Sequence, residues 1–175
     1  KQAFNKKRII IEVKDPKPLE NPKDEQGNIV EANLYSYEFI VPLSEADSLY
    51  PLMLKNLSQF TDYSADIEKR KVKCLVLKRT STQDKLKTKS TTTRFSFSVS
   101  KTDLQNTSVY ALVNNLNALP FIPYPIVDQT GYKTNIDLKM GKIEDLNALR
   151  KELLLYDVDL VEEEQELDML IIKDK

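Results

Sequence analysis

The stretch from Pro125 to Tyr132 (Pro-Ile-Val-Asp-Gln-Thr-Gly-Tyr) constrains the fold of this chain more than any other part of the sequence. A short apolar segment enters a polar turn that contains Gly131, one of only three glycines, and a second short segment follows at 135–140. Amphipathic helix patterns lie on both sides of this stretch. The order helix, strand, turn, strand, helix predicts an α+β fold, but it does not identify a chemistry.

The turn itself offers the sharpest motif of the sequence. An aspartate side chain can accept hydrogen bonds from backbone N–H groups nearby, and glycine adopts a positive φ without steric cost. We therefore interpret Asp128 and Gly131 as structural turn residues. A small ligand-binding or catalytic turn around Asp128, with Thr130 and Tyr132 as further binding candidates, is the alternative.

Composition limits the chemistry that the chain can perform. With 41% hydrophobic and 30% charged residues, the 175-residue chain is typical of globular proteins, and its net charge of -1 predicts no nucleic-acid partner. There is no histidine, and Cys74 is the only cysteine, so an internal disulfide and a cysteine zinc cluster are excluded. Cys74 lies in an apolar run and is expected to be buried. We expect no cofactor, no metal and no catalytic residue.

Three amphipathic helices are predicted, at 49–60, 108–119 and 143–155. Ser48 is the expected N-cap of the first helix, and Ser108 or Thr107 is that of the second. Strands are predicted at 8–13, 34–41, 64–68, 72–79, 94–100, 126–127, 135–140, 158–163 and 167–173. No apolar run is long enough to span a membrane.

The two halves of the chain resemble each other, since each has a helix followed by two strands. The second strand is a hydrophobic run in both cases, Cys74–Leu77 and Met169–Ile172. The sequence therefore predicts two related lobes, or one lobe plus a half-copy, of βαββ-type units with antiparallel or mixed strands. Residues 1–80 form the N-terminal lobe, residues 81–93 a polar linker or exposed loop, and residues 94–175 a βαββαββ lobe.

Weaker candidates for binding sites are distributed along the chain. Lys85, Lys87 and Lys89 could contact an anionic surface, although a solvated linker explains them as well. Glu162–Glu164, with Glu166 and Asp168, lack the spacing of a calcium loop and are expected in a solvated hairpin turn. An aromatic surface could be formed by tyrosines near predicted loops and strand ends: Tyr35, Tyr37, Tyr50, Tyr124 and Tyr132.

The segments Tyr110–Leu116, Pro125–Tyr132 and Ile136–Leu138 resemble an uncharacterised bacterial domain family. Its members carry a helix, a turn of the form P-V-V-D-x-T-G-L and a strand of the form Y-D-F-x-L. Two later segments, 148–153 and 169–172, fit its last helix and strand, and parts of 53–77 are similar to its N-terminal half. The chain departs from the family at Thr134, where a second glycine is usual, and in lacking a histidine before Glu68.

The resemblance implies an exported protein, located in the periplasm or the cell envelope. Some relatives in that family follow thioredoxin-like redoxin domains. The C-terminal half is also similar in element order to the short N-terminal domain of secretins and TonB-dependent receptors, which is an interaction module and not an enzyme. The chain begins with Lys1 and not with Met, so we expect that an N-terminal segment precedes it.

The sequence thus favours a non-catalytic binding or interaction module of a bacterial cell-envelope or exported protein. Its partner would be another protein or an envelope component, and the oligomeric state is left open. Two alternatives remain at this point. The chain could be an accessory domain of an exported thioredoxin-like redox protein, or a hydrolase whose carboxylates come together from distant positions.

Overall fold

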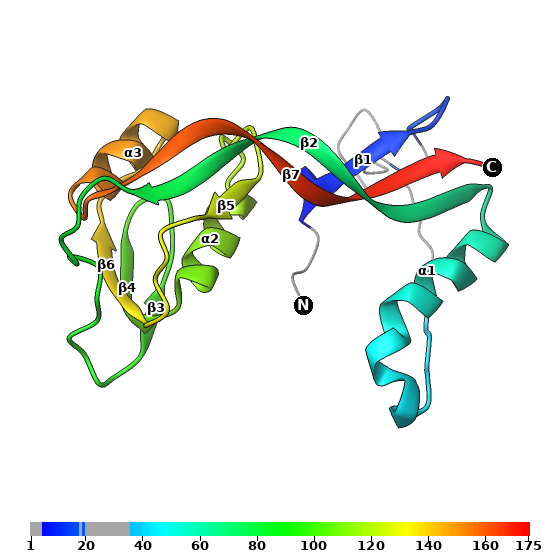
Figure 1. The fold of residues 1–175 in the computed structure, drawn as a ribbon, viewed down its shortest axis with the longest axis horizontal. Helices are drawn as coiled ribbons and strands as arrows, with labels where there is room; N and C mark the ends of the chain where they lie inside the picture. Colours follow the sequence, from blue (N-terminus) through cyan, green and yellow to red (C-terminus); the bar gives the residue numbers. More distant parts are fainter. Residues whose placement is uncertain (1–4, 18, 20–35) are drawn as a thin grey trace. The chain divides into compact units, whose positions relative to one another are not determined.

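The computed structural model describes residues 5–17, 19 and 36–175, and it confirms the α+β class. Its described part contains three α-helices and seven strands (Figure 1). The helices are α1 (Leu49–Phe60), α2 (Val109–Ala118) and α3 (Leu146–Leu154). The strands are β1 (Ile9–Glu12), β2 (Tyr63–Arg79), β3 (Arg94–Ser96), β4 (Thr102–Thr107), β5 (Ile126–Asp128), β6 (Ile136–Met140) and β7 (Val158–Asp174).

The described chain divides into two compact units. The first comprises residues 5–7 and 70–167, and the second comprises 8–17, 19, 36–69 and 168–175. The strands β2 and β7 contribute residues to both units. The polar segment 81–93, where the sequence predicts a linker, belongs to the first unit.

Both β2 and β7 are single strands of 17 residues, so the two strand pairs predicted from the sequence, with an acidic turn between the last two, were wrong. The predicted break in β2 falls on a basic run (Lys69-Arg70-Lys71), and the predicted break in β7, at 164–166, begins at the end of an acidic run (Glu162-Glu163-Glu164). The strands are neighbours in the sheet. Opposite charges on adjacent strands stabilise both strands, as in the pair between Lys78 and Glu163.

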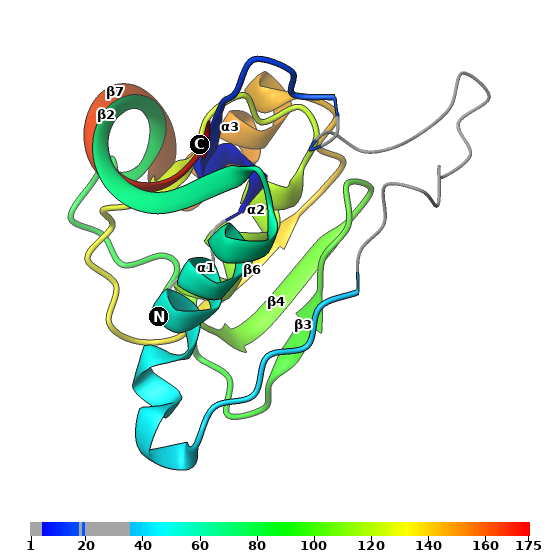
Figure 2. The ribbon, with the colours of Figure 1, turned by 90° about the vertical axis from the view of Figure 1, so that its right-hand side faces the viewer.

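Two sheets form the first unit. β5 pairs in parallel with β2, while β3, β4 and β6 form an antiparallel sheet (Figure 2). The turn at Gly131 therefore connects two different sheets and does not close a hairpin. The sequence missed β4 and extended the strand at 94–100 beyond the observed end of β3 at Ser96.

The core of the first unit lies between these sheets and the helices α2 and α3. Cys74, Leu75, Val76 and Leu77 of β2 are all fully buried, as expected for a strand that is covered on both faces. Other core residues come from every major element: Leu104, Leu112, Leu116, Ile136, Leu138, Leu149, Leu153, Val158 and Leu160.

Polar side chains fix the helix ends and one strand edge of this unit. Ser108 accepts a hydrogen bond from the Ala111 backbone N–H, which confirms the predicted N-cap of α2. The buried Asn117 side chain accepts a bond from the Ile126 N–H at 2.9 Å and donates to the Ile126 carbonyl. Asn117 thereby satisfies the edge of β5 that faces away from β2.

The second unit contains β1, which pairs in parallel with β7, and the helix α1. The bounds of α1 match the prediction, and Ser48 precedes it without a side-chain capping bond. The strand predicted at 34–41 was wrong for residues 36–41, which form no strand, and Leu34 and Tyr35 lie outside the described residues. Alternating apolar residues define two faces, but a strand also needs a partner.

None of the helices in the described part of the chain is long and apolar enough to cross a membrane.

Candidate functional site

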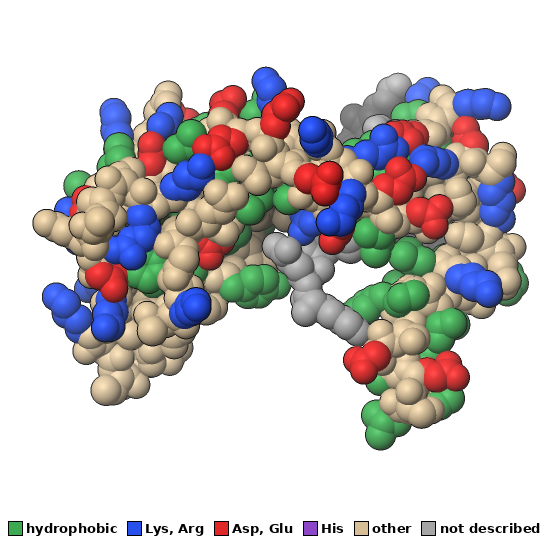
Figure 3. Space-filling model, in the orientation of Figure 1, with side chains coloured by type: hydrophobic (Ala, Val, Ile, Leu, Met, Phe, Trp, Pro, Cys, Tyr) green, Lys and Arg blue, Asp and Glu red, His purple; other side chains and the backbone are tan. Residues whose placement is uncertain are grey.

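Exposed apolar side chains gather on the second unit, over α1 and the segment before it (Figure 3). Leu43 is 92% exposed, Ile40 81%, Phe60 78% and Tyr50 56%. We call these four residues the α1 surface. No residue of α1 is buried, although its apolar residues recur at helical spacing. Large apolar groups exposed together are typical of surfaces that bind a partner.

A locally ordered segment lies next to the α1 surface in the sequence. The Tyr37 hydroxyl donates a hydrogen bond to the Asn56 side chain of α1 at 2.8 Å, and the Tyr37 and Phe39 rings stack with centroids 6.1 Å apart. These contacts hold residues 37–39 against α1. The short 3-10 helix Leu43–Ser48 then leads directly into α1.

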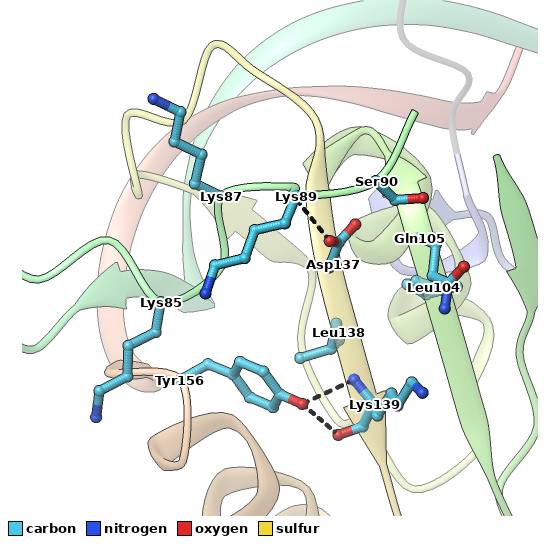
Figure 4. A pocket seen from close by; sticks show the side chains of 10 residues that line it. All are labelled: Lys85, Lys87, Lys89, Ser90, Leu104, Gln105, Asp137, Leu138, Lys139 and Tyr156. Carbon is cyan, nitrogen blue, oxygen red and sulfur yellow. Dashed lines mark hydrogen bonds between the residues drawn. The ribbon is translucent and has the colours of Figure 1, made fainter. Parts of the chain in front are cut away.

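A pocket of about 460 Å³ lies in the first unit, between β4, β6 and the segment 85–90 (Figure 4). Residues that line it include four lysines, Lys85, Lys87, Lys89 and Lys139, and a single acidic residue, Asp137. The pocket is thus much more basic than the chain as a whole, in which 26 basic residues balance 27 acidic ones.

The segment 85–90 lies along β6, and its side chains alternate between exposed and inward-facing positions. Leu86 is fully buried, and its carbonyl accepts a hydrogen bond from the Asp137 N–H at 2.8 Å. The Thr88 N–H donates to the Asn135 carbonyl at 3.0 Å. Leu86 therefore anchors the segment, and the three lysines on the opposite side of the alternation are left exposed.

Asp137 connects three segments at the pocket wall. Its carboxylate accepts hydrogen bonds from the Thr88 hydroxyl at 2.6 Å and from the backbone N–H groups of Lys89 and Asn106, each at 2.8 Å. Burial alone would raise the pKa of Asp137, but these bonds outweigh it and lower the pKa below the usual value of 3.8. Asp137 is therefore ionised at neutral pH.

A β-bulge in β4 brings the Asn106 N–H to Asp137. The pairing of β4 with β6 shifts register between Leu104 and Thr107, and Asn106 lies there with φ +49°. Asparagine tolerates this left-handed conformation better than most residues do. The Asn135 side-chain amide donates to the Asn106 carbonyl at 3.1 Å, which further fixes the bulge.

Tyr156 closes the edge of β6 at the other end of the pocket. Its hydroxyl accepts a hydrogen bond from the Lys139 N–H and donates one to the Lys139 carbonyl, both at 2.9 Å (Figure 4). The neighbouring Asp157 accepts a bond from the Lys85 ammonium group at 2.8 Å. Leu86 and Thr88 hydrogen-bond to the same edge of β6 as Tyr156 does. Another strand therefore cannot pair with this edge.

The residues of the predicted turn lie elsewhere in the first unit. The Asp128 carboxylate accepts bonds from the Thr130 N–H at 2.8 Å and from the Thr130 hydroxyl at 2.7 Å. Gly131 has φ +73°, which confirms the positive value expected from the sequence. None of Asp128, Thr130 and Tyr132 lines the pocket, and their role in binding stays a prediction.

Tyr132 has a distinct electrostatic environment. Burial and the neighbouring Asp84 raise the pKa of its hydroxyl, and the Arg79 guanidinium lies over its ring, 5.0 Å from the centroid. Tyr124 has a similar neighbour in Lys73, whose ammonium group is 5.9 Å from the ring centroid. Both tyrosines thus contact a cationic side chain of β2.

The other sequence candidates are distributed between the two units. Cys74 is fully buried, as predicted. The acidic residues from Glu162 to Asp168 lie within β7, and the described residues contain no group of histidine, cysteine and acidic side chains that could hold a metal ion. Tyr37 and Tyr50 are exposed on the second unit, and Tyr35 lies outside the described residues.

Sequence reasoning identified three of the four pocket lysines but missed Lys139, Asp137 and Tyr156. The alternation in Ile136-Asp137-Leu138-Lys139-Met140 could have placed Asp137 and Lys139 on one face of a strand. Nothing in the sequence brings that face beside residues 85–90.

Comparisons of the chain with protein-family models, with curated proteins and with solved structures find no match. The resemblance to an exported bacterial domain family stays a prediction.

Proposed function

We propose that this chain is a non-catalytic binding module of a bacterial cell-envelope or exported protein, and that it recognises another protein through the α1 surface. The single observation that carries the proposal is the exposure of Leu43, Ile40 and Phe60, each more than three-quarters accessible. Scattered exposed apolar residues are ordinary, but three such side chains around one amphipathic helix with no buried residue are a feature of binding surfaces.

The geometry around α1 supports recognition by an apolar partner surface. The Tyr37 bond to Asn56 orders the segment before the helix, so a partner would not have to order this part of the surface itself. Aromatic residues such as Tyr50 and Phe60 contribute most to protein interfaces when they become buried. The localisation in the envelope rests on the sequence resemblance alone.

Site-specific photo-crosslinking in a cell-envelope extract of the source organism tests this proposal. A crosslinker placed at Leu43 or Phe60 should form an adduct with one protein, and excess unmodified chain should compete with it. The double variant Leu43→Ser/Phe60→Ser should not compete. A crosslinker at Lys101, an exposed position of the first unit, provides the matched control.

An adduct at Lys101 equal to that at Leu43, or competition by the double variant equal to that of the native chain, would contradict the proposal. Substrate turnover that is abolished by one carboxylate substitution would replace the binding module with an enzyme.

A further inference from the structure

We propose that the lysine-lined pocket of the first unit binds a small molecule that carries two or more carboxylate or phosphate groups. The inference concerns a different unit from the α1 surface and does not depend on the proposed function. It starts from the concentration of charged residues, since four lysines and one aspartate line a volume of about 460 Å³. Pockets that hold small ligands commonly have this size.

The one carboxylate of the pocket does not stand free to repel an anion. Asp137 already accepts three hydrogen bonds, from Thr88, Lys89 and Asn106, and these donors compensate its charge. The ammonium groups are less fully engaged. Among the described residues, no acidic side chain pairs with Lys87 or Lys89, while Lys85 pairs with Asp157 and Lys139 lies 4.0 Å from Asp103.

Lys89 occupies the central position. Figure 4 shows its side chain extending across the pocket, whereas Lys85, Lys87 and Lys139 lie at the rim with their side chains pointing outward. The backbone of Lys89 is held by the bond from its N–H to Asp137 at 2.8 Å. Because the backbone is fixed and the four-carbon side chain is flexible, the ammonium group can adjust to a carboxylate or to a phosphate group.

The number of lysines sets the charge of the ligand. Exposed ion pairs are individually weak, so a single negative charge would not be held against salt. A ligand with two or more anionic groups can contact Lys89 and one or two rim lysines together. The ammonium groups are point charges and do not select between carboxylate and phosphate oxygens, which is why the shared chemistry defines the site.

An NMR titration at constant ionic strength tests this site with two probes, citrate for carboxylates and pyrophosphate for phosphates. At least one probe should shift the backbone amide resonances of Lys87, Lys89, Asp137 and Lys139 in a saturable manner. Saturation by citrate alone or pyrophosphate alone would support the site and identify its preferred anion. Acetate, with one charge, should give no saturable shift.

Matched variants separate the pocket from general surface charge. Lys89→Ala/Lys139→Ala should weaken binding by about tenfold, because two of the four charges are lost. Lys101→Ala removes an equal exposed charge outside the pocket and should leave binding unchanged. Lys89→Arg keeps the charge and should retain binding. All three positions are exposed, and unchanged amide spectra elsewhere would show that each variant folds.

The proposal would be overturned by shifts that fail to saturate, by shifts of equal size at Lys101, or by undiminished binding in the double alanine variant.

Discussion

The helices of the two units differ in how much of their apolar face the described chain covers. Five residues of α2 are buried, including Leu112 and Leu116, and α3 buries Leu149 and Leu153. No residue of α1 is buried. All three helices have apolar residues at helical spacing, so the spacing shows that a helix has an apolar face, and the fold decides whether that face is covered.

The same contrast appears within a single strand. In the first unit, Cys74–Leu77 of β2 are buried on both faces, whereas Ile67, in the part of β2 that belongs to the second unit, is 51% exposed. A regular backbone continues through both units, while the burial of its side chains follows the local packing. The first unit thus has a buried hydrophobic core, whereas the second unit leaves apolar side chains exposed.

A pair of leucine truncations tests this comparison and should give the largest difference in the free energy of unfolding. Leu112→Ala in α2 removes a fully buried side chain from the core and should lower the free energy of unfolding by about 2–5 kcal/mol. Leu43→Ala, at a position that is 92% exposed, should change it by less than about 0.5 kcal/mol. Urea unfolding followed by circular dichroism measures both. Equal costs would break the comparison.

A buried amide should have the next largest effect. Asn117→Ala would leave the Ile126 N–H and carbonyl without their side-chain partner, at a cost of about 1–3 kcal/mol. Asn115→Ala removes only a bond to the Ala111 carbonyl on the same helix and should cost less. Thermal unfolding of the two variants separates the cases, and a larger loss for Asn115 would show that the edge of β5 does not depend on Asn117.

Substitutions at two glycines should have a smaller effect on stability. Gly131→Ala should destabilise the protein by about 1 kcal/mol, because φ at this position is +73°. An added Cβ would meet no atom within 4 Å, so the cost is conformational and not steric. Gly141→Ala is the control, since its Cβ would make only ordinary contacts with Glu152. An unchanged melting temperature for Gly131→Ala would contradict the reasoning.

The smallest expected effect is a dependence of stability on pH in the first unit. Hydrogen bonds lower the pKa of Asp137 despite burial, and the Arg150 side chain lowers the pKa of Asp159. A lowered pKa in the folded state gives stability that is present above the ordinary value of 3.8 and is lost as pH falls through the folded pKa. Asp137→Asn should therefore reduce the loss of stability measured by urea unfolding between pH 5 and about pH 3. An identical pH profile for Asp137→Asn and the native protein would show that Asp137 does not contribute to this pH dependence.

The sequence allowed the three helices to be predicted, with α1 correct at both ends, because helical spacing and capping residues are local signals. It did not predict β4, whose residues Thr102-Asp103-Leu104-Gln105-Asn106-Thr107 are mostly polar. Thr102 and Leu104 face inward there, and Thr102 is fully buried. A threonine that takes a core position gives no hydrophobic signal.

Charged runs misled the prediction of the longest strands for a related reason. Lys69-Arg70-Lys71 and Glu162-Glu163-Glu164 each favour a loop when read alone, yet both lie within strands. The partner of Glu163 on the neighbouring strand is Lys78, a pairing of distant residues that neither run reveals. The pocket was not predicted for the same reason. Lys85, Lys87 and Lys89 were visible candidates, but Lys139 and Tyr156 join them only through pairings between distant segments.

The passage of β7 through both units has a consequence for the order of events during synthesis. Residues 158–167 complete the first unit and 168–174 the second, and both lie far along the chain from the β2 segments beside them. The sheet of β1, β7, β2 and β5 cannot be completed while β7 is still inside the ribosome, whereas the strands of the sheet of β3, β4 and β6 all precede β7 in the chain. Contacts between such distant segments form slowly, so the sheet that contains β7 should be the last part of the described chain to form.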